Sequence, residues 1–90
     1  MFHVVFTEKA LKTLKKFDRY TALLITAWIR KNLEGCTDPR LHGKPLTGDR
    51  AGQWRYRVGN YRILAEISDE RVTILVLKRG DRKDIYNDYL

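Results

Sequence analysis

The stretch "QWRYRVGNYRILAEI", residues 53–67, decides the fold because it has the pattern of a complete β-hairpin. Both halves alternate between apolar and polar side chains, as half-buried strands do, and Gly59-Asn60 between them suits a two-residue turn. If those two residues are the whole turn, Arg57 pairs directly with Arg62. The hairpin then fixes the pairing of every residue in both strands.

Strand alternation divides the side chains of this hairpin into two sets. The apolar set, which we assign to the core, comprises Trp54, Tyr56, Val58, Tyr61, Ile63 and Ala65. The other set places Arg55, Arg57 and Arg62 on an open face. Like charges directly opposite each other cost about 0.2 to 1 kcal/mol on a sheet, and such local conflicts tend to mark function. The alternative is an ordinary surface network in which Glu66 or another acid neutralises the arginines.

The sequence before the hairpin predicts one strand and two helices. Residues 2–6 form a short β-rich run, and Thr7 is placed to cap a first helix. Asp18 can cap a second helix that reaches about residue 34. Because this second helix is apolar around most of its circumference, we expect it to be buried on more than one side. Residues 35–52 then form a long connection.

After the hairpin, residues 72–77 predict a last strand, and residues 84–89 a short C-terminal helical turn. The order is therefore β-α-α-β-β-β. Helices grouped before the strands predict an α+β domain, with two helices packed on one face of a small antiparallel sheet. The length of 90 residues suits a single domain, residues 1–90.

Composition limits the classes of function. Cys36 is the single cysteine and the two histidines lie far apart, so we expect no disulfide, no metal and no cofactor. No apolar run approaches the roughly 18 residues of a membrane span, and the start does not resemble a secretory signal, so we expect a cytoplasmic protein without membrane contact. The net charge of +7 suggests an anionic partner, either nucleic acid or an acidic protein, or simply a soluble basic surface.

The grouped arginines suit phosphate chemistry. A guanidinium stays charged and offers a planar fork of donors that can engage two phosphate oxygens. The sequence has no nucleophile elbow, no phosphate-binding glycine loop and no paired histidines. Cleavage of RNA can proceed without them, since the substrate supplies its own 2′-hydroxyl nucleophile and the protein must orient it and stabilise the transition state.

Three blocks of the sequence resemble the RelE/ParE superfamily of toxin–antitoxin toxins, and specifically the RelE-like messenger-RNA interferases. The blocks are "F…TEKALKTLKKF", "GKPLTGDRAGQWRYRVGNYRILAEI" and "VTILVLKRGDRKDIY". The resemblance implies a RelE-like toxin that enters the ribosomal A site, cleaves messenger RNA there and is held inactive by a cognate antitoxin. That antitoxin is expected to be acidic, helical and RelB-like, and operator DNA would be bound only by the toxin–antitoxin complex.

The resemblance also implies a set of catalytic residues. The family's basic positions on the second strand fall on Arg55 and Arg57, and the arginine after the hairpin turn falls on Arg62. The arginine after the last strand, associated with leaving-group protonation and phosphate contact, falls on Arg82. The C-terminal tyrosine that orients or stacks on the substrate falls on Tyr86. Because arginine is a poor general base, we assign the two second-strand residues to phosphate binding.

Further basic residues can extend the contact with RNA or the ribosome. They are Lys9, Lys12, Lys16, Lys44, Arg50, Arg79 and Lys83. Two other functions stay open at this point. One is a ParE-like inhibitor of DNA gyrase without nuclease activity, which would share the fold. The other is a non-catalytic nucleic-acid-binding module.

Overall fold

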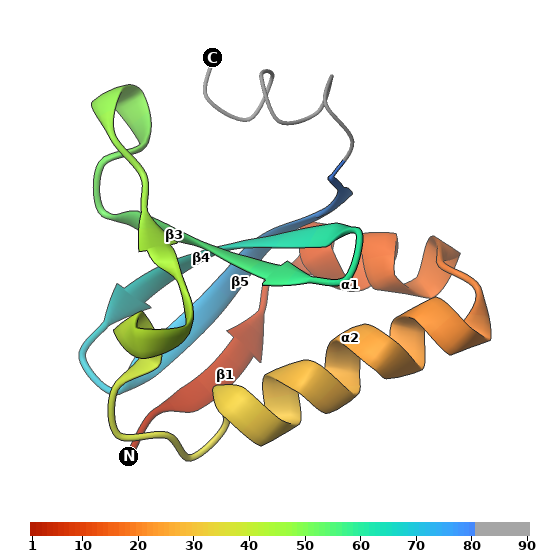
Figure 1. The fold of residues 1–90 in the computed structure, drawn as a ribbon, viewed down its shortest axis with the longest axis horizontal. Coiled ribbons are helices and arrows are strands. Elements are labelled where there is room, and N and C mark those ends of the chain that lie inside the picture. The colour runs from red at the N-terminus through yellow and green to blue at the C-terminus, as the bar shows by residue number, and fades with distance from the viewer. Residues whose placement is uncertain (81–90) are drawn as a thin grey trace.

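The computed structural model describes residues 1–80, in which two helices cover one face of a five-stranded sheet (Figure 1). The helices are α1 (Glu8–Lys16) and α2 (Arg19–Asn32), and the strands are β1 (His3–Phe6), β2 (Lys44–Pro45), β3 (Gln53–Val58), β4 (Tyr61–Ser68) and β5 (Arg71–Arg79). Two short 3-10 helices, η1 (Pro39–His42) and η2 (Gly48–Arg50), lie between α2 and β3. The α+β fold is confirmed, while the helical turn expected at residues 84–89 lies outside the described residues.

The sheet has the strand order β1-β5-β4-β3-β2, and it is antiparallel except at one edge. There β1 pairs with β5 in parallel, with Val4 opposite Val72. Because the two helices follow β1 in the chain, β1 does not pair with the next strand in the sequence but with the last one, β5. No local sequence pattern records a pairing between such distant segments. The sequence pattern also missed β2, because its two residues are too few to show alternation.

The hairpin has the register that its two-residue turn predicts. Arg57 faces Arg62 and Arg55 faces Leu64, so the pairing of β3 with β4 is confirmed. On its other side β4 pairs with β5, which brings Lys78 opposite Arg62. The register shifts by one residue farther along, between Leu64 and Ala65.

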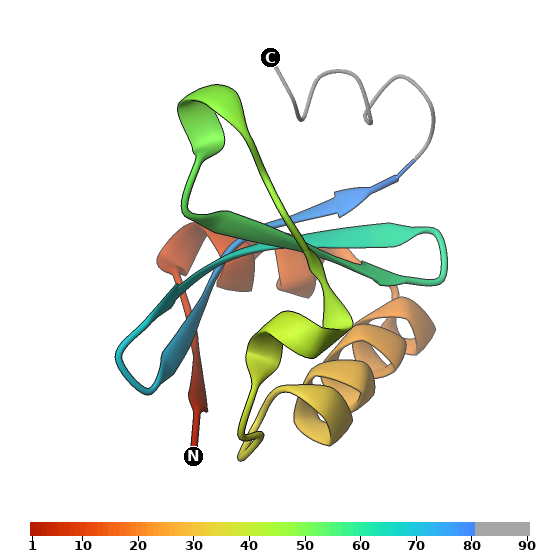
Figure 2. The ribbon, with the colours of Figure 1, turned by 60° about the vertical axis from the view of Figure 1, so that its left-hand side comes forward.

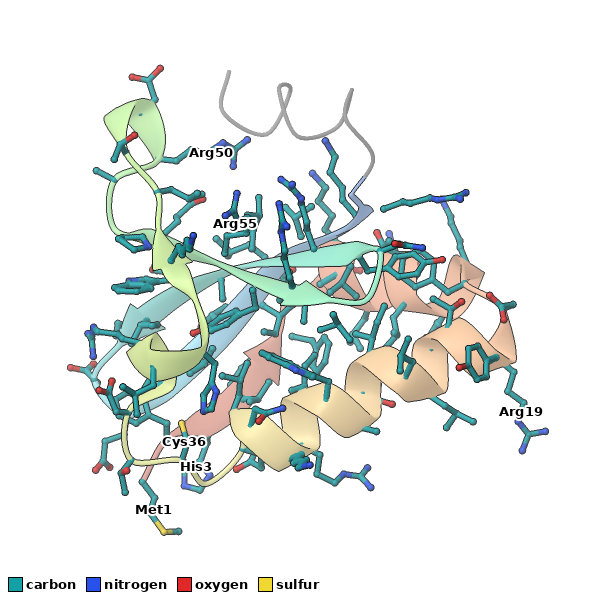
Figure 3. All side chains as sticks on the ribbon, in the orientation of Figure 1. Met1, His3, Arg19, Cys36, Arg50 and Arg55 are labelled. Carbon is teal, nitrogen blue, oxygen red and sulfur yellow. The ribbon has the colours of Figure 1, made fainter. Side chains whose placement is uncertain are left out.

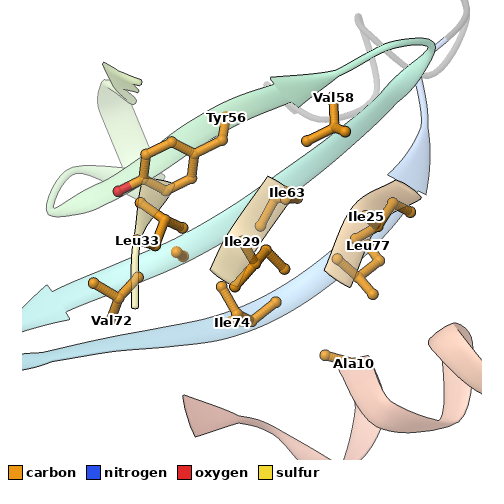
Figure 4. Packing of buried hydrophobic residues seen from close by; sticks show 11 residues of the cluster. Ala10, Ile25, Ile29, Leu33, Tyr56, Val58, Ile63, Val72, Ile74 and Leu77 are labelled. Carbon is orange, nitrogen blue, oxygen red and sulfur yellow. The ribbon is translucent and has the colours of Figure 1, made fainter. Parts of the chain in front are cut away.

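The hydrophobic core lies between the helices and the sheet (Figure 4). Its buried members are Ala10, Ile25, Ile29, Leu33, Tyr56, Val58, Ile63, Ala65, Val72, Ile74 and Leu77. Trp54 and Tyr61 are partly buried and pack against this cluster. The apolar face that alternation assigns to the core is therefore confirmed for all six residues of the hairpin.

Both helices begin at the caps that the sequence predicts. The Thr7 hydroxyl oxygen accepts the backbone N–H of Ala10 at 3.1 Å and donates to the carbonyl of Leu75 at 3.2 Å, tying α1 to β5. The carboxylate of Asp18 accepts the N–H of Thr21 at 3.3 Å. Hydrogen bonds with Thr21 hold the pKa of the Asp18 carboxyl below its usual value, because they favour the charged form.

The second helix is buried on one side only, so the expectation of burial on several sides is wrong. Ile25 and Ile29 are buried against the sheet, whereas Tyr20 is 74% and Leu23 58% exposed. Apolar pattern alone does not say what covers each side chain. No helix within residues 1–80 is long and apolar enough to cross a membrane.

Candidate functional site

Three basic side chains stand side by side across three strands, on the face of the sheet away from the helices. Arg62 in β4 is flanked directly by Arg57 in β3 and by Lys78 in β5. We call these three residues the basic row. Side chains opposite each other on neighbouring strands have Cβ atoms about 4.5 to 5.5 Å apart, so the row concentrates positive charge in a small area.

Arg62 occupies the centre of the row and is only 1% exposed. Strand alternation gives its side of the sheet correctly, but the expectation of an open position is wrong for this residue. The chain passes close over it at Gly80, where an added Cβ atom would lie 2.9 Å from the Arg62 Nε. Gly80 is held there by its backbone N–H, which donates to the carbonyl of Asn60 in the hairpin turn.

Burial changes what this guanidinium can do. An arginine stays ionised in proteins, and a charge removed from water interacts more strongly with an opposite charge nearby. Holding such a charge inside a fold is costly unless it is compensated. The centre of the basic row is therefore a position where an anion gains more than it would at the open surface.

A small hollow at the end of the hairpin gives access to the row. It is lined by Arg57, Gly59, Asn60, Tyr61, Arg62 and Gly80, and its volume is about 150 Å³. A water molecule takes up about 30 Å³ in the liquid, so the hollow has room for about five waters, or for one phosphate group. We call it the hairpin hollow.

Further predicted residues gather along the same face. Lys44 in β2 faces Arg55 in β3. Arg55 is two residues from Arg57 and lies on the same side of β3. Figure 3 shows Arg50 and Arg55 pointing to one side, away from the helices. The Arg50 Nη1 also donates to the Gln53 side chain at 3.4 Å. The structure thus brings together five predicted residues: Lys44, Arg50, Arg55, Arg57 and Arg62.

Four predicted residues lie elsewhere. Lys9, Lys12 and Lys16 border a separate hollow of about 470 Å³ on α1, beyond the opposite face of the sheet. Arg79 faces Tyr61, whose ring packs against Phe17 at 5.2 Å, so it lies on the helix side. Three more predicted residues, Arg82, Lys83 and Tyr86, lie outside the described residues.

Lys78 was missed by the sequence analysis. The last strand was expected to end at residue 77, whereas β5 continues to Arg79. The turn between β4 and β5 pairs Ser68 with Arg71, and that register continued along both strands would place Leu77 opposite Arg62. The register shift between Leu64 and Ala65 brings Lys78 there instead, and no pattern in the sequence records this shift.

Glu66 does not stand beside the basic row. It faces Gln53 in β3 and Thr73 in β5. It is four residues along β4 from Arg62, which corresponds to about 13 Å at about 3.3 Å per residue. Glu66 is therefore not a neighbour of Arg62 at the centre of the row, although on the same face it is next to the pair of Arg55 with Leu64.

Sequence and structure comparisons agree on the class of protein to which this fold and this basic face belong, the small toxins of toxin–antitoxin systems. The sequence matches the family described as the ParE toxin of the type II toxin–antitoxin system, parDE, over residues 4–86. The chain therefore belongs to the RelE/ParE family of type II toxin–antitoxin toxins.

Individual relatives support this assignment. Toxin RelG of Mycobacterium tuberculosis (strain ATCC 25618 / H37Rv) is 43% identical over 49 residues, a stretch that spans 54% of this chain and 56% of that relative. The solved RelBE2 toxin–antitoxin complex of Mycobacterium tuberculosis is similar with a TM-score of 0.79 and 30% identity, covering 87% of this chain and 96% of the matched chain. The archaeal RelE–RelB complex of Pyrococcus horikoshii OT3 has a TM-score of 0.68 and 25% identity, covering 90% and 97%.

Proposed function

We propose that this toxin is a ribosome-dependent endoribonuclease, which cleaves messenger RNA in the ribosomal A site and so inhibits translation. The observation that carries the proposal is the basic row, with a buried arginine at its centre and a phosphate-sized hollow beside it. Opposed cations weaken a sheet, and a phosphate of the RNA backbone carries the charge opposite to that of this face. The proposal treats residues 1–90 as one toxin domain.

The chemistry needs no metal in this proposal. The 2′-oxygen of the nucleotide before the cut attacks the adjacent phosphorus and loses its proton, and the bond from phosphorus to the 5′-oxygen breaks. The products are a 2′,3′-cyclic phosphate and a 5′-hydroxyl, whose oxygen gains a proton. Arg57 and Arg62 stabilise the negative charge that builds up on the phosphate oxygens. The proposed catalytic set also includes Arg55, Arg82 and Tyr86. From the family resemblance, Arg82 protonates the leaving group and Tyr86 orients the substrate.

The proposed partners follow from the related complexes. The matched Mycobacterium and Pyrococcus structures each hold a toxin with its antitoxin. We propose that this chain likewise binds a cognate antitoxin, RelB-like, acidic and helical, which covers the basic face and blocks cleavage. Operator DNA would be bound only through that complex. The toxin would act in the cytoplasm, where ribosomes and messenger RNA are found.

The test is cleavage of a defined messenger RNA by the purified protein. The messenger RNA is supplied either free or bound to ribosomes. We expect cutting only with ribosomes, ends that carry 2′,3′-cyclic phosphate, and no cutting when the nucleotide before the cut is 2′-deoxy. Chelation of divalent ions, after the ribosomes are stalled and fixed, should change neither the position nor the rate of cleavage. Cleavage of the 2′-deoxy message at the same rate would overturn the proposed chemistry.

A second function is favoured by one specific observation, the match to the family named after ParE over residues 4–86. In this alternative the protein inhibits DNA gyrase by binding, without nuclease chemistry. A supercoiling assay with purified gyrase and no ribosomes separates the two. Inhibition of gyrase together with intact messages would support the alternative and exclude the nuclease.

A further inference from the structure

A second hollow lies beside the hairpin hollow, and its lining includes three of the predicted basic residues, although no particular part of the RNA has been assigned to it so far. It is lined by Leu41, His42, Gly43, Lys44, Arg55 and Arg57, and its volume is about 350 Å³. We call it the flank hollow. Small-molecule sites in proteins have volumes of about 300 to 1,000 Å³, so this one is large enough for a single nucleotide. Arg57 borders both hollows, which makes them neighbours.

The walls of the flank hollow are fixed by contacts behind it. The hydroxyl of the buried Tyr56 donates to the carbonyl of Pro39 at 2.9 Å, which ties η1 to β3. Burial raises the pKa of Tyr56, so the hydroxyl keeps its proton and stays a donor. Gly43 lies so close to β3 that an added Cβ atom would be 2.7 Å from the Arg55 carbonyl oxygen. The site is therefore formed before a ligand arrives.

The lining combines two kinds of surface. Lys44 faces Arg55 across the β2–β3 pair, and Arg57 follows on the same side of β3. Beside these cations Leu41 is 77% exposed, so the hollow also has an apolar wall. Among residues 1–80, no acidic side chain lines the hollow. A nucleotide has matching parts, an anionic phosphate and a flat base whose faces are apolar.

We propose that the flank hollow is the subsite for the nucleotide next to the scissile phosphate of the bound RNA. Lys44 and Arg55 bind its phosphate, and its base packs on Leu41. Arg57, shared by the two hollows, contacts both phosphates and sets the register of the RNA on the protein. The inference rests on the proposed function for the scissile phosphate, but binding at this site does not require cleavage.

Binding is tested first, with a hexanucleotide that is 2′-O-methylated throughout and so has no 2′-hydroxyl to attack. Amide resonances of the full chain are followed by NMR as this RNA is added. The largest shifts are expected at residues 41–44 and 55–57. Shifts confined to α1, or no saturable shift at all, would overturn the inference.

Variants then separate the two parts of the subsite. Lys44→Ala should weaken binding of the hexanucleotide roughly three- to tenfold, as expected for the loss of one hydrogen bond from an exposed side chain. It should also lower the slope of log K against log salt by about 0.7, the value for one phosphate of a single strand. Leu41→Ala should weaken binding by a smaller factor, roughly two- to fivefold, without changing that slope. Lys31→Ala, which removes an exposed charge on α2, is the matched control and should change neither quantity.

Cleavage kinetics distinguish failure of this inference from failure of the proposed function. With programmed ribosomes, Lys44→Ala should raise the half-saturating concentration of toxin and leave the rate at saturation within about twofold, because Lys44 binds but does not react. If the wild type cleaves the message and Lys44→Ala has the same half-saturating concentration, the subsite is refuted and the nuclease function is not. No cutting by the wild type, with the NMR shifts in place, would refute the nuclease and leave an RNA-binding site.

Discussion

Removing one charge from the basic row should make the fold more stable. Arg62 faces Arg57 on one side and Lys78 on the other, so Arg57→Gln removes one of two like-charge pairs. Such a pair costs about 0.2 to 1 kcal/mol, and because Arg57 is exposed the lower half of that range applies, about 0.2 to 0.5 kcal/mol. A domain of this size gains about 4 to 8 °C in Tm per kcal/mol, so Tm should rise by about 1 to 4 °C.

The assay is thermal and urea unfolding of wild type and Arg57→Gln at pH 8, in low and high salt. The gain should disappear near 1 M salt, where the screening length is only about 3 Å. Arg71→Gln is the matched control, since Arg71 is exposed on β5 and faces Ser68 on one side and His3 on the other, with no lysine or arginine opposite it. Lower stability of Arg57→Gln at low salt, or a gain that salt does not reduce, would refute the view that the row is electrostatically strained.

Three further predictions concern the frame that positions the site. Thr7→Val, which removes the cap of α1 and the bond to the Leu75 carbonyl, should lower the free energy of unfolding by about 1 to 2 kcal/mol in urea titrations, while Thr7→Ser should restore most of it. Tyr56→Phe leaves the Pro39 carbonyl without its donor and should cost about 1 to 2 kcal/mol; an unchanged urea midpoint would contradict the role of this bond. Hydrogen bonds from the β1 backbone and His3 lower the pKa of Glu34 from 4.5, so its contribution to stability is present above that pH and is lost as the pH falls through the lowered pKa. Unfolding midpoints measured across this acid range should therefore show a weaker pH dependence in Glu34→Gln, and an identical acid dependence would argue against this contribution.

Local sequence information was enough to predict the hairpin. Gly59 has a φ of +58°, the left-handed conformation that glycine adopts readily, and the two-residue turn it forms with Asn60 fixes the pairing of all residues in β3 and β4. The helix caps are equally local, since each depends on one side chain and a backbone N–H three residues later. The pairings that were missed join distant segments, β1 with β5 and β2 with β3.

The candidate site could be predicted only in part, for the same physical reason. Alternation places Arg62 on the correct side of the sheet, but it does not record that Arg62 is buried or that Gly80 approaches its Nε from the end of β5. The flank hollow depends on Gly43, which brings the segment before β2 onto β3. Exposed apolar residues of α2 such as Tyr20 follow the pattern of core residues, because a sequence records polarity and not the neighbours of a side chain.

The central claim is that the basic row holds the phosphate at which messenger RNA is cut, and primer extension on a translated message tests it most directly. Wild type, Arg57→Gln and Arg71→Gln are induced in turn, and each variant is first shown to be folded by its melting curve. The account predicts cuts aligned to codons with wild type and with Arg71→Gln, and at least a hundredfold fewer with Arg57→Gln, as for the loss of one transition-state donor, which costs about 10²–10³ in rate. Codon-aligned cuts of equal strength in the folded Arg57→Gln variant would contradict it.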